Sequence, residues 1–185
     1  LNKVIFGGKM KKIIFIFIIV QTMVFSMSFS GGKTFSLSGD MALPDGDVST
    51  SEKTGYFLEF YPSEQEFIEA GLGLKFNHYL SSEDNATVTR LTILYAIARF
   101  KRNLIGMFPY IQIRAGFPYS VDGELITEGR DLEGQIFGSL GVGTQIAFID
   151  WSVNYEMNTY NYTKTTGGSD RVLQKLVTVS LGFKF

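Results

Sequence analysis

The chain has 185 residues, a formal net charge of −1, 15% aromatic side chains, no cysteine and one histidine. This composition excludes a disordered chain, a disulfide framework, a thiolate metal site and any site that requires two histidines. All 18 acidic residues follow residue 30, so residues 31–185 carry −5, which argues against a nucleic-acid partner.

The first 30 residues contain the features of an export signal. Residues 10–12 read Met-Lys-Lys, residues 13–20 are an unbroken apolar run, and small residues follow at Ser28 and Ser30. A membrane-spanning helix needs about 20 apolar residues, which is longer than this run. We therefore expect residues 10–30 to be a signal peptide cleaved after Ser28 or Ser30, and residues 1–9 to be an over-extended reading frame.

The remainder of the chain, residues 31–185, shows the two-residue alternation of half-buried strands and no sustained helical period. The last segment is the clearest, because Val179, Leu181, Phe183 and Phe185 share one face and smaller or polar residues share the other. In chain order the expected strands are 34–43, 54–61, 68–77, 91–98, 110–117, 135–148, 151–158 and 176–185.

The connections between these strands alternate in length. The short ones are 61–65, 101–106 and 149–150, and the others, mostly longer and rich in Gly, Ser, Thr and acids, are 44–53, 81–86, 121–134 and 163–171. An even number of strands with tight turns at one end and longer loops at the other is typical of barrels that span a membrane. We therefore predict an all-β fold, an eight-stranded antiparallel up-and-down transmembrane β-barrel.

A soluble lipocalin-like barrel or a β-sandwich is the alternative fold. Such a protein would direct its apolar face inward and its charged face outward. Here the polar face carries bulky ionic groups interleaved with glycines, which suits a small lumen filled by side chains. The membrane-spanning fold is therefore favoured.

With this pattern the chain resembles the small eight-stranded outer-membrane barrels of the OmpA-transmembrane-domain and OmpX type. The specific part of the resemblance is the C-terminal strand with its apolar alternation and terminal aromatic residue. The resemblance implies that the barrel-assembly machinery reads Phe185, with Phe183, Leu181 and Val179 in support. It also implies outer-membrane lipids as the surroundings of the protein.

The polar face supplies a candidate network of charges inside the lumen. We expect cross-lumen ion pairs, with Arg114 or Arg90 bound to Glu156 as the first candidates, either as a filled interior or as a gate for a narrow conductance. The expected network consists of Asp40, Glu59, Glu69, Lys75, Arg90, Arg114 and Glu156.

A lipid-hydrolysing site near His78 is a weaker hypothesis. Lipid A deacylase barrels carry His, Ser and Glu on the outer wall, and here Ser81, Ser82 and Glu83 follow His78. The usual spacing of two residues between His and Ser, which places both on one face of a strand, is absent. We therefore expect no enzyme activity, no cofactor and no metal site.

Two further groups of charges lie at the ends of the predicted barrel. The four longer connections hold 11 acids and 4 bases, a net −7, which suits a solvated cap, divalent cations or a basic host surface. At the opposite end, Arg99, Lys101 and Arg102 are expected either to meet lipid phosphates or to snorkel.

The expected role is structural or surface interaction through extracellular loops, in a Gram-negative-type outer membrane. A narrow pore or small-ligand conduit is the alternative.

Overall fold

The structure is a computed structural model that describes residues 27–43, 46–49, 54–64, 67–80, 89–122, 132–163 and 169–185. These residues form the strands β1 (Ser28–Leu43), β2 (Gly46–Ser49), β3 (Thr54–Glu64), β4 (Ile68–Leu80), β5 (Thr89–Lys101), β6 (Met107–Asp122), β7 (Leu132–Ile146), β8 (Ile149–Thr163) and β9 (Ser169–Lys184). Within these ranges, no helix has the length and apolar character needed to cross a membrane.

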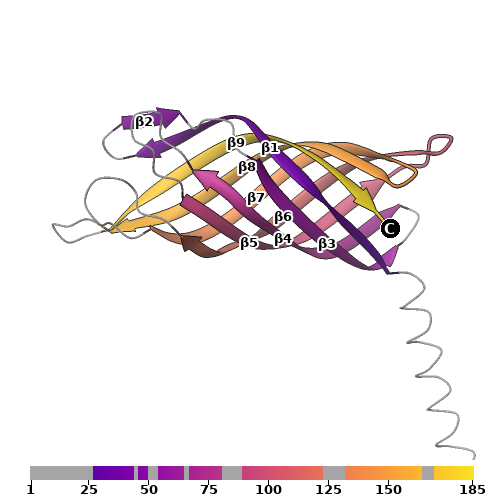
Figure 1. Ribbon diagram of the computed structural model, residues 1–185, viewed down its shortest axis with the longest axis horizontal. Helices are drawn as coiled ribbons and strands as arrows, with labels where there is room; N and C mark the ends of the chain where they lie inside the picture. Colours follow the sequence, from indigo (N-terminus) through magenta and orange to yellow (C-terminus); the bar gives the residue numbers. More distant parts are fainter. Residues whose placement is uncertain are drawn as a thin grey trace, which may run out of the picture.

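Eight of the strands close into a barrel. Each strand from β3 to β9 is antiparallel to the next, and β1 pairs with both β3 and β9, which completes the ring (Figure 1). The short strand β2 pairs with the last four residues of β1, at the end of the barrel opposite the C-terminus. The prediction of an eight-stranded antiparallel barrel is therefore confirmed, with β2 as an addition to it.

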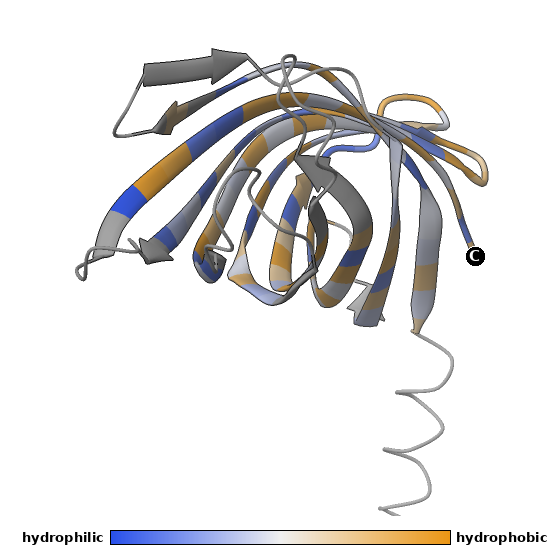
Figure 2. Cartoon of the chain, turned by 60° about the vertical axis from the view of Figure 1, so that its left-hand side comes forward, coloured by the Kyte–Doolittle hydropathy of each residue, from blue (hydrophilic) through white to orange (hydrophobic). Residues whose placement is uncertain are grey.

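Hydrophilic and hydrophobic residues alternate along the strands (Figure 2), and buried side chains alternate with exposed ones. On β9, Leu181 and Phe183 point outward and are each 51% exposed, whereas Ser180 and Lys184 are buried inside. An apolar outer wall around a charged interior is the arrangement of a barrel surrounded by lipid and the reverse of a lipocalin. The chain is therefore a transmembrane β-barrel.

The tight connections gather at one end, which we call the turn end, and the other end is the loop end. β3 runs to Glu64, so its turn starts later than the expected 61–65. The turn between β7 and β8 is formed by Ala147 and Phe148 rather than by 149–150, since Ile146 pairs with Ile149. Ala147 has φ 52°, the positive φ that two-residue hairpin turns require. As a result Asp150 lies inside a strand.

β5 directs its odd-numbered residues into the lumen, whereas the expected lumenal position of Arg90 implied that its even-numbered residues point inward. Leu91, Ile93 and Ile97 are buried there. Both faces of this strand are apolar up to residue 98, so hydropathy alone did not distinguish them. The reversal brings Tyr95 and Arg99 into the barrel interior.

Candidate functional site: the ion-paired lumen

A buried arginine joins three walls of the barrel near the turn end. Arg99 on β5, which is 1% exposed, donates to Glu59 on β3 at 2.8 Å and to Asp150 on β8 at 2.6 Å. Its guanidinium lies between two aromatic rings, 5.0 Å from the centroid of Tyr61 and 4.5 Å from that of Tyr110. Arginine suits this position because its planar group can bind two carboxylates and stack on rings at once.

Glu59 is the acceptor at the centre of the same cluster. One carboxylate oxygen accepts from the hydroxyl of Tyr95 at 2.9 Å and from Arg114 at 2.8 Å. The other accepts from the hydroxyl of Tyr61 at 2.7 Å and from Arg99. Four donors to one buried carboxylate offset much of the cost of removing its charge from water.

Asp150 completes the cluster on the far wall. The hydroxyl of Tyr110 donates to one of its oxygens, and Ser30 on β1 lies 3.5 Å from the other. The two acids Glu59 and Asp150 balance the two bases Arg99 and Arg114. We call these four residues, with Tyr61, Tyr95 and Tyr110, the arginine cluster; its direct contacts cross the lumen from β3 through β5 to β8.

Two smaller ion-paired groups lie on either side of the arginine cluster. Lys75 on β4 binds Glu156 on β8 at 2.5 Å, and the hydroxyl of Thr178 donates to the same carboxylate at 2.9 Å. Toward the turn end, the buried Glu69 accepts from both Lys101 and Lys184. The lumen is thus crossed by ion pairs at three places along its length.

Toward the loop end, apolar side chains fill the lumen together with the buried amides of Asn158 and Gln174. The side chains of Leu91, Ile93, Phe137, Tyr160 and Val172 form one buried cluster with no more than 1% exposure each. The hydroxyl of Tyr160 donates to Gln174 at 3.1 Å, which satisfies the polar atom of this ring. This packed group fills part of the lumen on the loop side of the arginine cluster.

Most of the expected lumenal charges are therefore inside the barrel. Glu59, Glu69, Lys75, Arg114 and Glu156 are all buried there. Arg114 donates to Glu59, and the cation bound to Glu156 at 2.5 Å is Lys75. The pairing of Arg114 with Glu156 stays a prediction.

Asp40 does not belong to the lumen. A β-bulge between Ser36 and Ser38 shifts the alternation of β1, so that Asp40 is exposed on the outer face opposite the exposed Lys175 of β9. A bulge inserts one residue and exchanges the two faces of the strand beyond it, an effect that simple alternation does not include. The placement of Asp40 in the lumen was therefore wrong.

Two other expectations fall outside the described side chains. The backbone of Arg90 pairs with Asp122 and that of His78 with Leu91, but both side chains lie outside the described residues. Residues 81–83 also lie outside them. The hypothesis of a hydrolytic site at these positions stays a prediction.

Comparison with known proteins identifies the fold. No family model and no curated protein matches the sequence. Among solved structures, neisserial surface protein A aligns with a TM-score of 0.55 at 12% identity over 86% of this chain and 97% of that chain. Outer membrane protein W of E. coli aligns with a TM-score of 0.49 at 14% identity, over 86% of this chain and 97% of that chain. OprG of Pseudomonas aeruginosa aligns with a TM-score of 0.46 at 12% identity, over 86% of this chain and 95% of that chain.

The chain has the fold of the small eight-stranded outer-membrane β-barrels.

In this outer-membrane barrel fold, two charged members of the arginine cluster, Arg99 and Asp150, could not be identified from alternation in the sequence. Arg99 was assigned to the turn end with lipid phosphates or snorkelling as its role, and the structure corrects this by burying it in the lumen. Asp150 was assigned to a turn. Counting alternate residues from Tyr95 leads to Arg99, but only if the inward face of β5 is already known.

The residues expected to guide assembly lie on the outer face of the barrel at its seam. Leu181 and Phe183 are exposed, and Phe185 is 80% exposed at the C-terminus. The backbone of Phe185 exchanges two hydrogen bonds of 2.8 Å with Phe29 of β1. Recognition of these side chains by the assembly machinery stays a prediction.

Proposed function

We propose that the protein is an outer-membrane protein of a Gram-negative-type envelope whose sealed barrel holds its connecting loops at the cell surface. The turn end would face the periplasm and the loop end the exterior, as in barrels of this fold. The observation that carries the proposal is the arginine cluster, because direct contacts join Glu59, Arg99 and Asp150 across the lumen. A lumen filled in this way leaves the outer surfaces and the loops as the places where the protein acts.

The charge of the loops supports a surface-interaction role. The four longer connections carry a net −7. Charge of one sign at the cell surface attracts basic partners and repels acidic ones. Adhesion to a basic surface, or shielding of the surface beneath, is therefore the role we propose, with no catalytic activity.

Conductance of the purified barrel in planar bilayers tests whether the lumen is sealed. We expect no stepwise channel events from the wild-type protein. The Arg99→Ala variant lacks the group that links Glu59 and Asp150 across the lumen. Leak currents should therefore be seen first in this variant. Sustained conductance by the wild-type protein would favour the alternative function, a narrow pore or small-ligand conduit.

Attachment of whole cells to polylysine-coated surfaces tests the role of the loops. The test variant changes three acids of the connection between β6 and β7 to amides, Glu124→Gln, Glu128→Gln and Asp131→Asn, and keeps its length. We expect weaker attachment than that of wild type, with the difference shrinking at high salt because exposed charges are screened. Unchanged attachment, with equal amounts of folded barrel at the surface, would contradict the proposed role.

A further inference from the structure

The outer wall of the barrel carries one unusual charge. Lys33 lies on β1 with an exposed side chain, in the register of the lipid-facing residues, and is paired with Leu181 of β9 on one side and Tyr56 of β3 on the other. Along β9 the outward residues Phe185 and Phe183 lie between Leu181 and the turn end, and Val179 and Val177 lie between it and the exposed Lys175. Lys33 therefore sits near the middle of the apolar band, two outward side chains from either edge.

The part of the chain that the structure describes gives Lys33 no acidic partner. Its ammonium lies 5.8 Å from the centroid of the Tyr56 ring, and among the described residues it has no ion pair. Lys175, at the edge of the band, faces the carboxylate-bearing Asp40 across the strands, but Lys33 faces Leu181. An unpaired ammonium in hydrocarbon is unfavourable, so such residues generally mark a site that another group completes.

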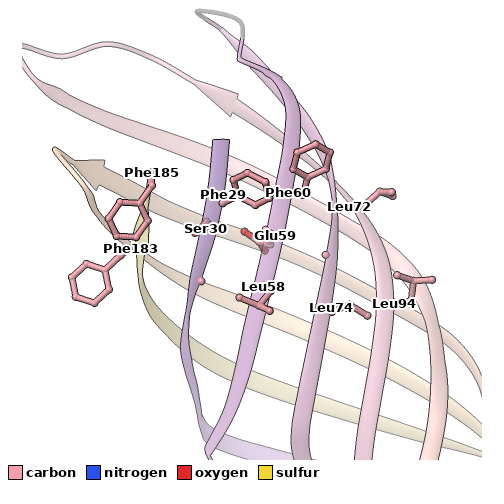
Figure 3. Close-up of a pocket in the computed structure, with 12 residues that line it drawn as sticks. Phe29, Ser30, Leu58, Glu59, Phe60, Leu72, Leu74, Leu94, Phe183 and Phe185 are labelled. Atoms are coloured by element: carbon pink, nitrogen blue, oxygen red, sulfur yellow. The ribbon is translucent and has the colours of Figure 1, made fainter. Parts of the chain in front are cut away.

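An apolar groove begins beside Lys33 on the same wall. Gly31, the next outward residue of β1, is one of the residues that line a groove of about 500 Å³, and the side chain of Leu58 on β3 lies 2.9 Å from the place of its missing Cβ atom. We call it the Gly31 groove; Figure 3 shows Phe29, Leu58, Phe60, Leu74 and Phe183 around it. Lys33 lies two residues from Gly31 on the same face of β1, which places a cation near one end of this apolar groove.

We propose that this wall binds a second membrane-spanning protein, whose apolar side chains fill the Gly31 groove and whose acidic side chain pairs with Lys33. Burial in lipid makes such a pair selective, because the carboxylate and the ammonium each lack any other counter-charge at that depth. The chemistry of the partner is thereby specified as a carboxylate in the middle of an otherwise apolar surface.

A second copy of this chain does not meet that requirement. Two copies in one membrane have the same orientation, so residues at equal depth face each other. The described outward residues at the depth of the band carry no carboxylate, and Asp40 lies seven residues farther along β1 at the edge of the band. A lipid phosphate fits less well, because Lys33 lies two outward side chains from either edge of the apolar band, away from the level of the headgroups.

Photocrosslinking in intact cells tests the proposal. A benzoylphenylalanine replaces Leu58 at the groove, and in a matched control it replaces Val142 on β7; these side chains are 54% and 57% exposed. Each is combined with native Lys33, Lys33→Arg and Lys33→Gln. We expect a protein adduct from position 58 with Lys or Arg at position 33, about tenfold less with Gln, and none from position 142.

A reciprocal exchange completes the test. In the captured partner protein, the acidic residue that pairs with Lys33 is changed to its amide, and this change should abolish the adduct. Changing that acidic residue to Lys and combining it with Lys33→Glu in this chain should restore the adduct. Adducts with lipid alone, with a second copy, or with a protein independently of residue 33 would each overturn the proposal. Heat-modifiable migration of every variant confirms that the barrel is folded, and this check separates failure of the docking site from failure of the outer-membrane assignment.

The purified protein supplies an independent check that needs no partner. In neutral lipid vesicles, Lys33→Leu should raise the urea concentration at the midpoint of unfolding, because it removes an unpaired charge from the apolar band. Lys33→Met provides the same comparison with an unbranched side chain. An unchanged midpoint in both variants would mean that Lys33 reaches water, which would overturn the argument for a partner.

Discussion

At the scale of single residues, the lumen shows why buried charges must be considered as groups. Arg99 has two carboxylates and two aromatic rings as its neighbours, and Glu59 has four donors. A buried ion pair adds little net stability relative to apolar packing, but loss of one member leaves an uncompensated charge. The arginine cluster therefore makes the folded barrel sensitive to each of its members.

The first prediction concerns Arg99. Changing Arg99 to Ala leaves Glu59 and Asp150 without their shared cation, and we expect the free energy of unfolding to fall by about 3–5 kcal/mol. The measurement is urea unfolding in lipid vesicles, followed by the fluorescence of Trp151, the single tryptophan. Arg171→Ala, at an exposed arginine of β9, is the control and should change stability by less than about 0.5 kcal/mol. Equal effects of the two changes would show that the arginine cluster has no special importance.

At the scale of secondary-structure elements, glycines in one strand make room for tyrosines of the next. Gly73 on β4 pairs with Tyr95 on β5, and a Cβ atom at Gly73 would lie 2.4 Å from the tyrosine ring. Gly143 on β7 has the same relation to Tyr110 on β6, at 2.6 Å. Tyr95 donates to Glu59 and Tyr110 to Asp150, so the space at a glycine on one strand positions a hydrogen-bond donor on the next.

The second prediction follows from this clearance. Gly73→Ala should displace the Tyr95 ring from Glu59 and lower the free energy of unfolding by about 1–3 kcal/mol, the usual cost of overpacking. Gly138→Ala is the matched control, because a Cβ atom there has no neighbour within 4 Å. The same vesicle unfolding assay compares the two variants. A loss of stability in Gly138→Ala as large as in Gly73→Ala would contradict the steric argument.

The third prediction concerns the start of β1. Ser28 pairs with Tyr61 of β3, and the backbone of Phe29 bonds to that of Phe185 at the seam, so residues before Gly31 already belong to the closed sheet. We therefore propose that an exported precursor is cleaved before Ser28, after the small residue Ser26, rather than after Ser28 or Ser30. The intact mass of the protein extracted from membranes measures this directly. A mature chain that begins at Gly31 would contradict the proposal.

At the scale of the whole molecule, closure of the sheet links the two ends of the chain. β1 and β9 form the seam, and the aromatic rings of Phe183 and Phe185 lie on its outer face. Closure satisfies the backbone groups that an open sheet would expose to lipid. Stability of the closed barrel and its delivery to the membrane are separate properties, and they can be measured separately.

The fourth prediction separates assembly from stability. Phe185→Ala keeps the backbone hydrogen bonds to Phe29, so the purified variant should refold in vesicles and unfold at nearly the wild-type urea concentration. In cells we expect several-fold less heat-modifiable barrel in the membrane fraction, because the terminal aromatic side chain is the proposed assembly signal. Phe148→Ala, at an exposed aromatic residue of a turn, is the control. Equal yields of the two variants in cells would contradict an assembly role for Phe185.

The sequence by itself determined the fold class, because strand alternation and the lengths of connections are local properties. The apolar outer face of β9 and the lumenal positions of Glu59, Lys75 and Glu156 could be identified by counting alternate residues. No contact between distant parts of the chain was needed for these assignments.

Only the tertiary structure decided which charges meet and which face of an ambiguous strand is inside. The bulge in β1 removed Asp40 from the lumen, and the hairpin at Ala147 brought Asp150 into a strand. β5 is apolar on both faces, and its burial of Arg99 depends on the neighbouring strands. Register, bulges and closure are set by pairing between distant segments, so partners such as Arg99 and Glu59, 40 residues apart, could not be derived from local alternation.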